Sequence, residues 1–503
     1  MQSSDQVTTA DLLDMDQVKV DPRWALRIPA SLAQRRQLLP FAKISQHVLV
    51  ACRDASDVQG LQAVERYVQA EILPQPAEPA SLDRAIQRIF ADALAGGNPS
   101  APLRAAIQAR VSNEEVEGEE IVALSHELFF AARIRQATDI HLEPGDHEAR
   151  VRMRVDGVLE EYRRIPLSVH QPLISRFKVL AGMDIAERRA PQDGRFTVGG
   201  DSGQAVDVRA ATIPTKRGER LTLRLLASQA QDLSLDKLGM TPTHWTAFAN
   251  ALQQPNGLIM LTGPTGCGKS TTLYAAIRHL MSLRPLNIIT IEDPVEYAID
   301  GVSQVEVDAA DKVSFHKALR AVLRHDPDVL MIGEIRDAET AEIVVKASLT
   351  GHLVLTSLHT NSALNSVNRL VDMGIKPFLI GAISRLYVAQ RLVRRLCAHC
   401  RSSRPLGETE ALALGQPERV GQTVFFPTGC RYCAGTGFAG RTGLFELLPF
   451  DAQLARWVHR NQDELSLREH LIEDGWTTML DDAWTKLSDG TTTPAEVIHV
   501  VSV

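Results

Sequence analysis

The sequence of 503 residues contains no run of about 18 uncharged apolar residues, the length that a membrane-spanning helix needs. Its first 20 residues are polar and acidic, and they lack the apolar stretch of a secretory signal peptide. These absences argue against both an integral membrane protein and an exported one. We expect the protein to stay in the cytosol.

Cysteine is also scarce, with six in the whole chain. Four of them fall in two Cys-x-x-Cys steps, so the spread of cysteines that a disulfide framework needs is missing. A basic balance is missing as well: the net charge is −7, which argues against a general nucleic-acid binder. Residues 150–224 depart from this balance, because they hold 15 lysines and arginines against 9 aspartates and glutamates.

The composition is that of a soluble globular protein, with 44% hydrophobic and 23% charged residues. A chain of this length exceeds one ordinary hydrophobic core and suggests about three domains. Changes of pattern along the sequence predict six segments. They are an N-terminal domain (1–94), a flexible linker (95–118), an α+β domain that presents arginines (119–230), an α/β domain (231–396), a tetracysteine module (397–436) and a C-terminal helical segment (437–503).

The most informative stretch is residues 257–272. An apolar run, Leu258–Leu261, has the character of a buried parallel strand and leads into Gly263-x-x-x-x-Gly268-Lys269-Ser270, which helix-forming residues follow. This is a phosphate-binding loop, because it offers a triphosphate backbone N–H groups, a helix N-terminus, an ammonium and a hydroxyl for Mg²⁺. A chance glycine-rich turn is the alternative, which the complete motif between strand and helix disfavours. The residues predicted to hold ATP are Gly263, Pro264, Thr265, Gly266, Cys267, Gly268, Lys269, Ser270 and Thr271, with Ser270 also binding Mg²⁺.

Alternating strands and helices surround this loop. Strands are expected at 287–291, 328–332 and 352–358, with helices between them and further helices up to about residue 395. This order predicts an open, mainly parallel α/β sheet, which binds ligands at the carboxyl ends of its strands. Before it, the α+β domain should contain two hairpins, one turning at Asp156-Gly157 and one at 214–218.

Glu334 is the predicted catalytic residue. It follows the apolar strand Val329–Ile332, where a carboxylate would reach the γ-phosphate and position the attacking water. An aspartate is more usual at the strand end, but that position is Gly333. The alternative role for Glu334 is a simple ion pair with Arg336.

Other strand ends supply further polar candidates. Glu292, Asp293 and Glu296 follow the strand at 287–291 and could assist the metal, or could instead cap helices. His352 and His359 flank the strand at 352–358 and could sense or contact the γ-phosphate. A histidine satisfied by a backbone carbonyl is the equal alternative.

Cys267 is unusual inside a phosphate-binding loop. A neighbouring lysine and the helix N-terminus should favour its thiolate, which predicts sensitivity to thiol reagents.

The remaining cysteine motif is Cys397-x-x-Cys400 with Cys430-x-x-Cys433. Four thiolates at this spacing can surround Zn²⁺ tetrahedrally, and they leave no open position, so the site should be structural. Redox chemistry by either pair is the alternative.

Assembled, these motifs resemble the secretion ATPases of the type II secretion and type IV pilus class. The resemblance is strong over about residues 119–503 and weak over 20–94. It is carried by Gly-Pro-Thr-Gly-Cys-Gly-Lys-Ser-Thr-Thr, by Thr-Ile-Glu-Asp-Pro-Val-Glu from residue 290, by Asp-Pro-Asp-Val-Leu-Met-Ile-Gly-Glu-Ile-Arg-Asp from residue 326, and by Thr-Gly-His-Leu-Val-Leu-Thr-Ser-Leu-His-Thr-Asn from residue 350. Glycine at 333 is normal in this class, whereas Cys267 and His325 depart from it.

The resemblance implies a RecA-like ATPase core after a small α+β, PAS-like domain and an N-terminal docking domain. It implies that Glu334 carries hydrolysis, that Glu292, Asp293 and Glu296 form an acidic box, and that His352 and His359 form a histidine box. It also implies arginines that reach the nucleotide when subunits close, at Arg195, Arg209 and Arg224. ATP, Mg²⁺ and Zn²⁺ are the implied cofactors.

The implied assembly is a homo-hexamer on the cytoplasmic face of the inner membrane, attached through a secretion platform. The tetracysteine module argues against the retraction motors of the class, and the short N-terminal domain favours the secretion branch over pilus extension. No motif for cyclic di-GMP is evident. Two other functions stay open: an ATP-dependent scaffold, and a nucleic-acid translocase, which the lack of a basic-aromatic stripe disfavours.

Overall fold

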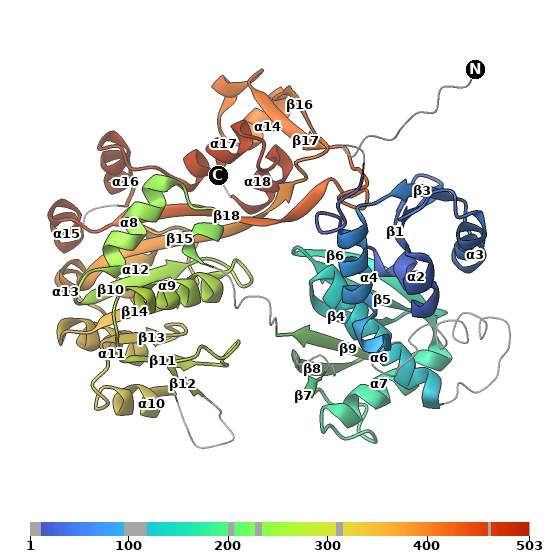
Figure 1. Ribbon diagram of the computed structural model, residues 1–503. Coiled ribbons are helices and arrows are strands. Elements are labelled where there is room, and N and C mark those ends of the chain that lie inside the picture. Colours follow the sequence, from blue (N-terminus) through green and yellow to red (C-terminus); the bar gives the residue numbers. More distant parts are fainter. Residues whose placement is uncertain are drawn as a thin grey trace. The chain divides into compact units, whose positions relative to one another are not determined.

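A computed structural model describes residues 12–94, 118–199, 206–226, 234–307, 315–460 and 464–501 (Figure 1). Apart from Gly118, the predicted linker lies outside these residues. The chain forms two compact units. The first comprises residues 1–228 with 397–401 and 427–439, and the second comprises the remainder. Within the described residues no helix has the length and apolarity to cross a membrane.

The first unit begins with a three-stranded sheet in the order β1-β2-β3. Helix α3 shows why its sequence folds as it does: Asp57 caps it by accepting from Gly60 N, and Leu61, Val64 and Val68 form its buried stripe. These side chains join one hydrophobic core with the sheet. The elements are α1 (Pro22–Ala25), α2 (Ala30–Arg36), β1 (Leu38–Ile44), β2 (His47–Cys52), α3 (Val58–Val68), β3 (Ile72–Pro76) and α4 (Pro79–Leu94).

A six-stranded antiparallel sheet follows, in the order β6-β5-β4-β9-β8-β7. Both predicted hairpins are confirmed, and the first turns at Asp156 and Gly157, which have φ of 49° and 84°. Apolar side chains of α6 and α7 share a core with this sheet. The elements are α6 (Gly118–Arg135), β4 (Ala137–Pro144), β5 (Glu148–Val155), β6 (Val158–Pro166), α7 (Leu167–Leu180), β7 (Gln192–Val198), β8 (Val206–Thr215) and β9 (Gly218–Leu225).

The second unit contains a seven-stranded sheet in the order β12-β11-β13-β14-β10-β15-β18. Six neighbouring strands of this sheet, β12-β11-β13-β14-β10-β15, pair in parallel, as predicted. The strands are β10 (Gly257–Thr262), β11 (Ile288–Glu292), β12 (Ser303–Glu306), β13 (Val329–Ile332), β14 (Leu353–Leu358), β15 (Ser384–Leu396) and β18 (Phe438–Pro449). The helices between them are α8 (Pro242–Leu252), α9 (Lys269–Leu283), α10 (Phe315–Val322), α11 (Ala338–Leu349), α12 (Asn365–Asp372) and α13 (Pro377–Ile383), and η3 (Leu235–Lys237) precedes them.

The prediction of helices up to residue 395 was wrong. Residues 384–396 form β15, which pairs with β10 through the buried run Leu386–Ala389. The prediction of a purely helical segment from residue 437 was also wrong, because β18 occupies 438–449 at the edge of the sheet. Both errors arise because a fully buried apolar run carries no period that separates strand from helix.

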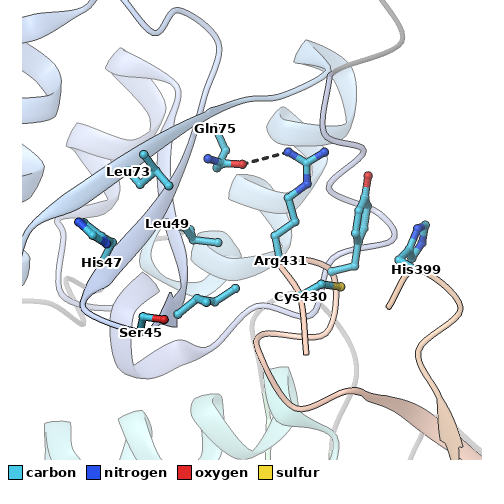
Figure 2. Close-up of a pocket in the computed structure, with 10 residues that line it drawn as sticks. Ser45, His47, Leu49, Leu73, Gln75, His399, Cys430 and Arg431 are labelled. Atoms are coloured by element: carbon cyan, nitrogen blue, oxygen red, sulfur yellow. Dashed lines mark hydrogen bonds between the residues drawn. The ribbon is translucent and has the colours of Figure 1, made fainter. Parts of the chain in front are cut away.

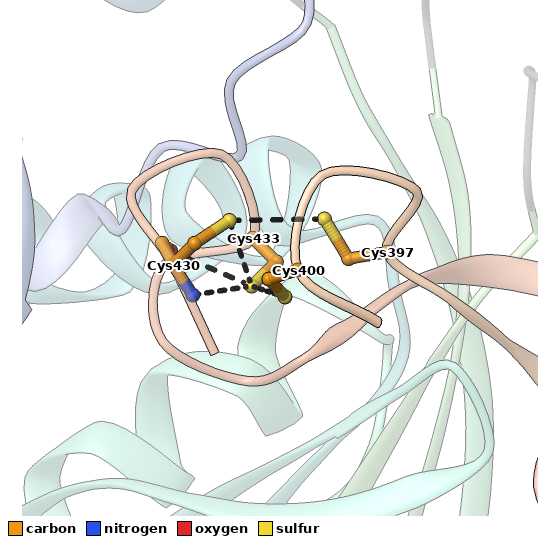
Figure 3. Close-up of side chains that lie close together, drawn as sticks. All are labelled: Cys397, Cys400, Cys430 and Cys433. Carbon is orange, nitrogen blue, oxygen red and sulfur yellow. Dashed lines mark hydrogen bonds between the residues drawn. The ribbon is translucent and has the colours of Figure 1, made fainter. Parts of the chain in front are cut away.

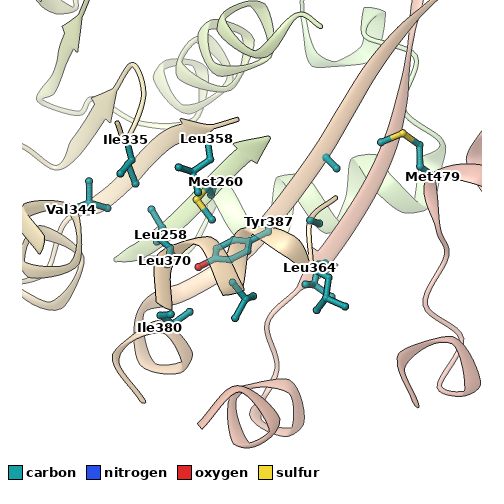
Figure 4. Packing of buried hydrophobic residues seen from close by; sticks show 14 of the residues in the cluster. Leu258, Met260, Ile335, Val344, Leu358, Leu364, Leu370, Ile380, Tyr387 and Met479 are labelled. Atoms are coloured by element: carbon teal, nitrogen blue, oxygen red, sulfur yellow. The ribbon is translucent and has the colours of Figure 1, made fainter. Parts of the chain in front are cut away.

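The sheet is buried on both faces, and β10 shows how. Leu258 and Met260 belong to one hydrophobic cluster, while Ile259 and Leu261 belong to another. Because successive side chains of a strand point to opposite faces, the two clusters cover the two sides of the sheet. Figure 4 shows part of the first cluster, where Leu258 and Met260 lie near Tyr387.

The rest of the second unit is a small β16-β17 sheet and a helical end. These elements are β16 (Arg401–Pro405), α14 (Glu408–Ala413), η4 (Pro417–Arg419), β17 (Thr423–Pro427), α15 (Ala452–His459), α16 (Glu464–Glu473), α17 (Met479–Ser488) and α18 (Pro494–Val500). The predicted helical character of the C-terminus is confirmed from α15 onward.

Candidate nucleotide-binding site and metal centre

The predicted phosphate-binding loop joins β10 to α9, in the strand-turn-helix order that the motif requires. Gly263, Gly266 and Gly268 have φ of 146°, 79° and 91°, which side chains with a Cβ rarely adopt. At Gly263 a Cβ would also lie 2.5 Å from the carbonyl oxygen of Gln390. Glycine is therefore required here by the fold itself.

Lys269 opens α9, and its Nζ lies over the loop. It donates to the carbonyl oxygens of Gly263 at 2.7 Å and Pro264 at 3.2 Å. Burial lowers the pKa of Lys269, an effect that the charges of Cys267 and Glu334 oppose. The ammonium is thus a partly desolvated cation at the end of β10, where charge acts more strongly than in water.

Cys267 corrects the prediction of a reactive thiolate. Its side chain is only 4% exposed, and burial raises the pKa of its thiol even though Lys269 and Arg391 act to lower it. Desolvation therefore outweighs the neighbouring cations.

We expect Cys267 to react with iodoacetamide far more slowly than a free thiol at pH 7.5, whether or not nucleotide is present. The measurement is peptide mass spectrometry of the labelled native protein, with urea-unfolded protein as the control. Rapid labelling of native Cys267 that nucleotide prevents would restore the original prediction.

Glu334 lies just beyond the end of β13, a parallel strand of the same sheet as β10. Arg336 Nε donates to its Oε1, and His359 Nε2 lies 2.7 Å from its Oε2. Burial acts to raise the pKa of Glu334, but these two hydrogen bonds outweigh it, so the pKa is lowered. The ion pair with Arg336 is thus present, and it keeps the carboxylate charged at the edge where the loop lies.

The three residues of the predicted acidic box have different surroundings. Glu292 is buried and accepts hydrogen bonds from Tyr274, Thr290 and Gln304. Asp293 instead accepts from Arg336 Nη1 at 2.9 Å, which joins it to Glu334 through one guanidinium. The backbone N–H of Glu296 donates to the Tyr274 hydroxyl at 3.2 Å. Asp293 is therefore the member that the structure connects to Glu334.

The two histidines are also separated. His359 contacts Glu334, but His352 precedes β14, whose six residues span roughly 20 Å. Its Nδ1 lies 2.9 Å from the carbonyl oxygen of Ala347. Of the two roles left open for His352, this contact matches a histidine satisfied by a backbone carbonyl, at the amino end of the strand.

The predicted arginines belong to the first unit, where they form a row across the six-stranded sheet. Arg195 is the register partner of Arg209, and Arg209 is the partner of Arg224. Arg224 in turn pairs with Asp139, whose Oδ1 accepts from its Nε at 3.1 Å. Directly opposed residues share a sheet face, so three neighbouring strands place these three arginines side by side on one face.

The four predicted zinc ligands come together (Figure 3). Their sulfur atoms all lie within 4.8 Å of one another, with Cys397–Cys430 at 3.9 Å and Cys400–Cys433 at 3.8 Å. Tetrahedral Zn²⁺ with bonds of about 2.3 Å separates its sulfur ligands by roughly 3.8 Å. These separations fit the metal and are too long for disulfides.

The backbone supports the thiolate form at Cys433. The N–H groups of Cys430 and Gly437 donate to its Sγ at 3.2 and 3.1 Å. Burial acts to raise the pKa of this thiol, but the N–H groups outweigh burial and lower it. Such bonds orient ligand sulfurs in a metal site.

The tetracysteine segments (397–401 and 427–439) belong to the first unit and pack against its N-terminal sheet. Tyr432 and Ala434 lie against the core of residues 13–90. Arg431 Nη1 donates to Gln75 Oε1 at 3.0 Å, beside a cavity of about 540 Å³ (Figure 2). The cavity is lined by Ile44, Ser45, His47, Leu49, Leu73, Gln75, His399, Cys430, Arg431 and Tyr432.

A family model described as Type II/IV secretion system protein matches residues 114–499, and one described as MshEN domain matches residues 10–96. The chain belongs to the Type II/IV secretion system protein family. The resemblance seen in the sequence is thereby confirmed, and membership together with the phosphate-binding loop makes this chain an ATPase.

Several named proteins are similar over most of this Type II/IV secretion system protein. Type II secretion system protein E of Pseudomonas aeruginosa is 39% identical over 505 residues, covering 98% of this chain and 99% of that protein. Type II secretion system protein E of Aeromonas hydrophila is 45% identical over 380 residues, covering 76% and 75%. The Type IV pilus assembly ATPase PilB of Myxococcus xanthus is 36% identical over 507 residues, covering 98% and 88%.

Solved structures share the fold. The pilus retraction motor PilT with bound ADP is 26% identical with a TM-score of 0.52, covering 75% of this chain and 96% of that one. The Legionella pneumophila ATPase DotB is 21% identical with a TM-score of 0.56, covering 74% and 94%. The α/β ATPase fold class predicted from the sequence is confirmed.

Sequence reasoning missed Gln390 and Arg391. Both lie on β15 next to the phosphate-binding loop, and both are buried. They were overlooked because this part of the chain, 384–396, was expected to be helical. Only a strand that pairs with β10 places them beside the phosphate-binding loop. A strand pattern in this apolar run would have been the signal.

Proposed function

We propose that this protein is the ATPase motor of a type II secretion system, which hydrolyses ATP to drive assembly of a pseudopilus and export of folded proteins across the outer membrane. The full-length similarity to type II secretion proteins E supports this. The observation that carries it is the shared sheet edge, where Lys269 and an ionised Glu334 lie at the ends of parallel strands. Type IV pilus extension is the second candidate, because the similarity to PilB is also nearly full-length.

Different residues bind the triphosphate, hold the metal and activate the water. The backbone N–H groups of Gly263 and residues 265–271 and the Lys269 ammonium bind the triphosphate, and Ser270 would hold Mg²⁺, which would supply charge neutralisation at the phosphates. Glu334 orients the attacking water and accepts its proton, while His359 and Arg336 hold the carboxylate in place. Asp293, tied to the same guanidinium, completes the acidic edge.

We assign the arginine row a separate role in binding the triphosphate. Arg195, Arg209 and Arg224 form a cationic surface suited to phosphate oxygens. We assign them to stabilising the triphosphate when subunits of a homo-hexamer close, a step that converts hydrolysis into movement. A ring of six would carry six such surfaces.

The motor acts on the cytoplasmic face of the inner membrane, held there by the cytoplasmic domain of an L-type platform protein and by the polytopic F-type protein. Zn²⁺ in the tetracysteine site serves structure, not catalysis. No nucleic-acid substrate is assigned.

The test compares phosphate release by the full chain alone, with acidic phospholipid vesicles, and with vesicles that carry the platform proteins. A motor should accelerate at least about tenfold with its platform. Equal, negligible turnover in every condition would identify a nucleotide-dependent scaffold, and acceleration by DNA would identify a translocase. Co-purification then separates the machines, since capture of pilus-extension components instead of the secretion platform would favour the second candidate.

A further inference from the structure

The side chain of Gln390 is held at both ends. It is 2% exposed, on the strand adjacent to the phosphate-binding loop. Its Nε2 donates to the carbonyl oxygen of Cys267 at 2.9 Å, and its Oε1 accepts from Thr272 Oγ1 at 2.8 Å. Cys267 lies in the loop and Thr272 in the first turn of α9, so one buried amide bridges the junction between them.

The hydrogen bond from Gln390 to the Cys267 carbonyl oxygen orients the whole peptide group between Cys267 and Gly268. The carbonyl of Cys267 and the N–H of Gly268 belong to the same planar trans peptide, in which the two groups point in opposite directions. Gln390 therefore sets the direction of the Gly268 N–H, which faces away from β15. Gly268 itself is held close, since a Cβ there would lie 2.9 Å from Gln390 Nε2.

Arg391, the next residue, holds the neighbouring loop. Its Nη2 donates to the carbonyl oxygen of Asn361 at 2.9 Å, and its Nη1 donates to the carbonyl oxygen of Gln390 at 3.0 Å. Asn361 lies two residues beyond His359, the partner of Glu334. Two consecutive residues of β15 thus hold the phosphate-binding loop and the loop that carries His359.

We propose that Gln390 is a positioning residue for nucleotide binding, which aims the Gly268 N–H at the bound phosphates by holding the Cys267 carbonyl. This inference rests on the proposed nucleotide site. The bridge joins protein groups alone, so we expect it to hold the loop in the free protein as well. Preorganisation of this kind favours affinity, because the loop loses less freedom on binding.

The test uses the full chain and a fluorescent mant-ADP titration, together with KM and kcat for ATP and the melting temperature. Gln390→Leu keeps the volume but removes both hydrogen bonds, and we expect it to raise the Kd and KM about tenfold while kcat changes by less than about threefold. Thr272→Val should weaken binding by a few-fold. Thr272→Ser, which keeps the hydroxyl, should restore the wild-type Kd.

The matched control is Ser384→Ala at the amino end of the same strand, which removes a buried hydrogen bond to Tyr387 that is 2.7 Å long. It should lower the melting temperature and leave the Kd unchanged. If Gln390→Leu behaves as this control does, the inference is refuted. Should Gln390→Leu fail to fold, Gln390→Met decides: it keeps an unbranched side chain but cannot donate to Cys267, so a wild-type Kd would overturn the proposal.

Lys269→Ala separates this inference from the proposed function. Unchanged mant-ADP binding in Lys269→Ala would overturn the nucleotide site and the inference with it. Loss of binding in Lys269→Ala, together with wild-type binding in Gln390→Leu, would overturn the inference alone.

Discussion

Replacement of Glu334 by glutamine should lower the turnover of ATP by about 10²- to 10⁴-fold, the range in which loss of a general base falls. Glutamine has the same size, and its one oxygen can still accept from Arg336, but it carries no charge and cannot take a proton from water. Nucleotide affinity should change little, because Lys269 and the loop are intact. The measurement is steady-state phosphate release with a parallel mant-ADP titration.

A suitable control for Glu334→Gln is Glu342→Gln on α11, whose carboxylate is 62% exposed and pairs with Lys346. This change removes one surface ion pair and should leave turnover within about twofold, since such pairs contribute little. Turnover in Glu334→Gln equal to that of Glu342→Gln would show that the edge of the sheet is not where ATP is hydrolysed.

Replacement of Cys430 by serine should remove the metal and destabilise the first unit. Isolated zinc fingers bind Zn²⁺ with about 10–16 kcal/mol, and we expect a loss on the order of 5 kcal/mol here, because the surrounding core persists. Cys430 adjoins Arg431 and Tyr432, which contact the N-terminal sheet and core. The measurements are metal content by mass spectrometry and the rate of proteolysis within residues 12–94.

Cys52→Ala serves as the control for the Cys430 variant. Cys52 is buried in β2, outside the tetracysteine cluster, and burial raises the pKa of its thiol to about 11. This variant should keep one equivalent of zinc while losing some packing. A full equivalent of zinc in Cys430→Ser, or unchanged proteolysis once zinc is gone, would contradict the structural role of the site.

Prediction from sequence succeeded where the chemistry depends on local spacing. The phosphate-binding loop and the two Cys-x-x-Cys steps each lie within a few residues, so the sequence shows them directly. The residues that could hold phosphate were named in the correct strand-turn-helix setting. The sequence also predicted that the four sulfur atoms converge, because two Cys-x-x-Cys pairs supply the four ligands of one tetrahedral Zn²⁺ site.

The errors came from contacts between residues far apart in sequence. Whether residues 384–396 form a helix or a strand is decided by pairing with β10, more than 120 residues earlier. The same holds for Cys267, whose burial depends on its surroundings in the fold. The two roles left open for His352 likewise depend on which end of β14 it occupies. Local charge and spacing do not determine such placements.

The division of the chain into units has a practical consequence for dissecting the protein. The tetracysteine segments belong to the first unit, although β15 and β18 of the second unit flank them in sequence. A fragment that stops at residue 228 would thus lack Tyr432 and Ala434, and would present Ile44 and the neighbouring apolar side chains to water. Aggregation of such a truncated fragment would reflect this uncovered surface, and a soluble version needs the cysteine loops restored by fusion.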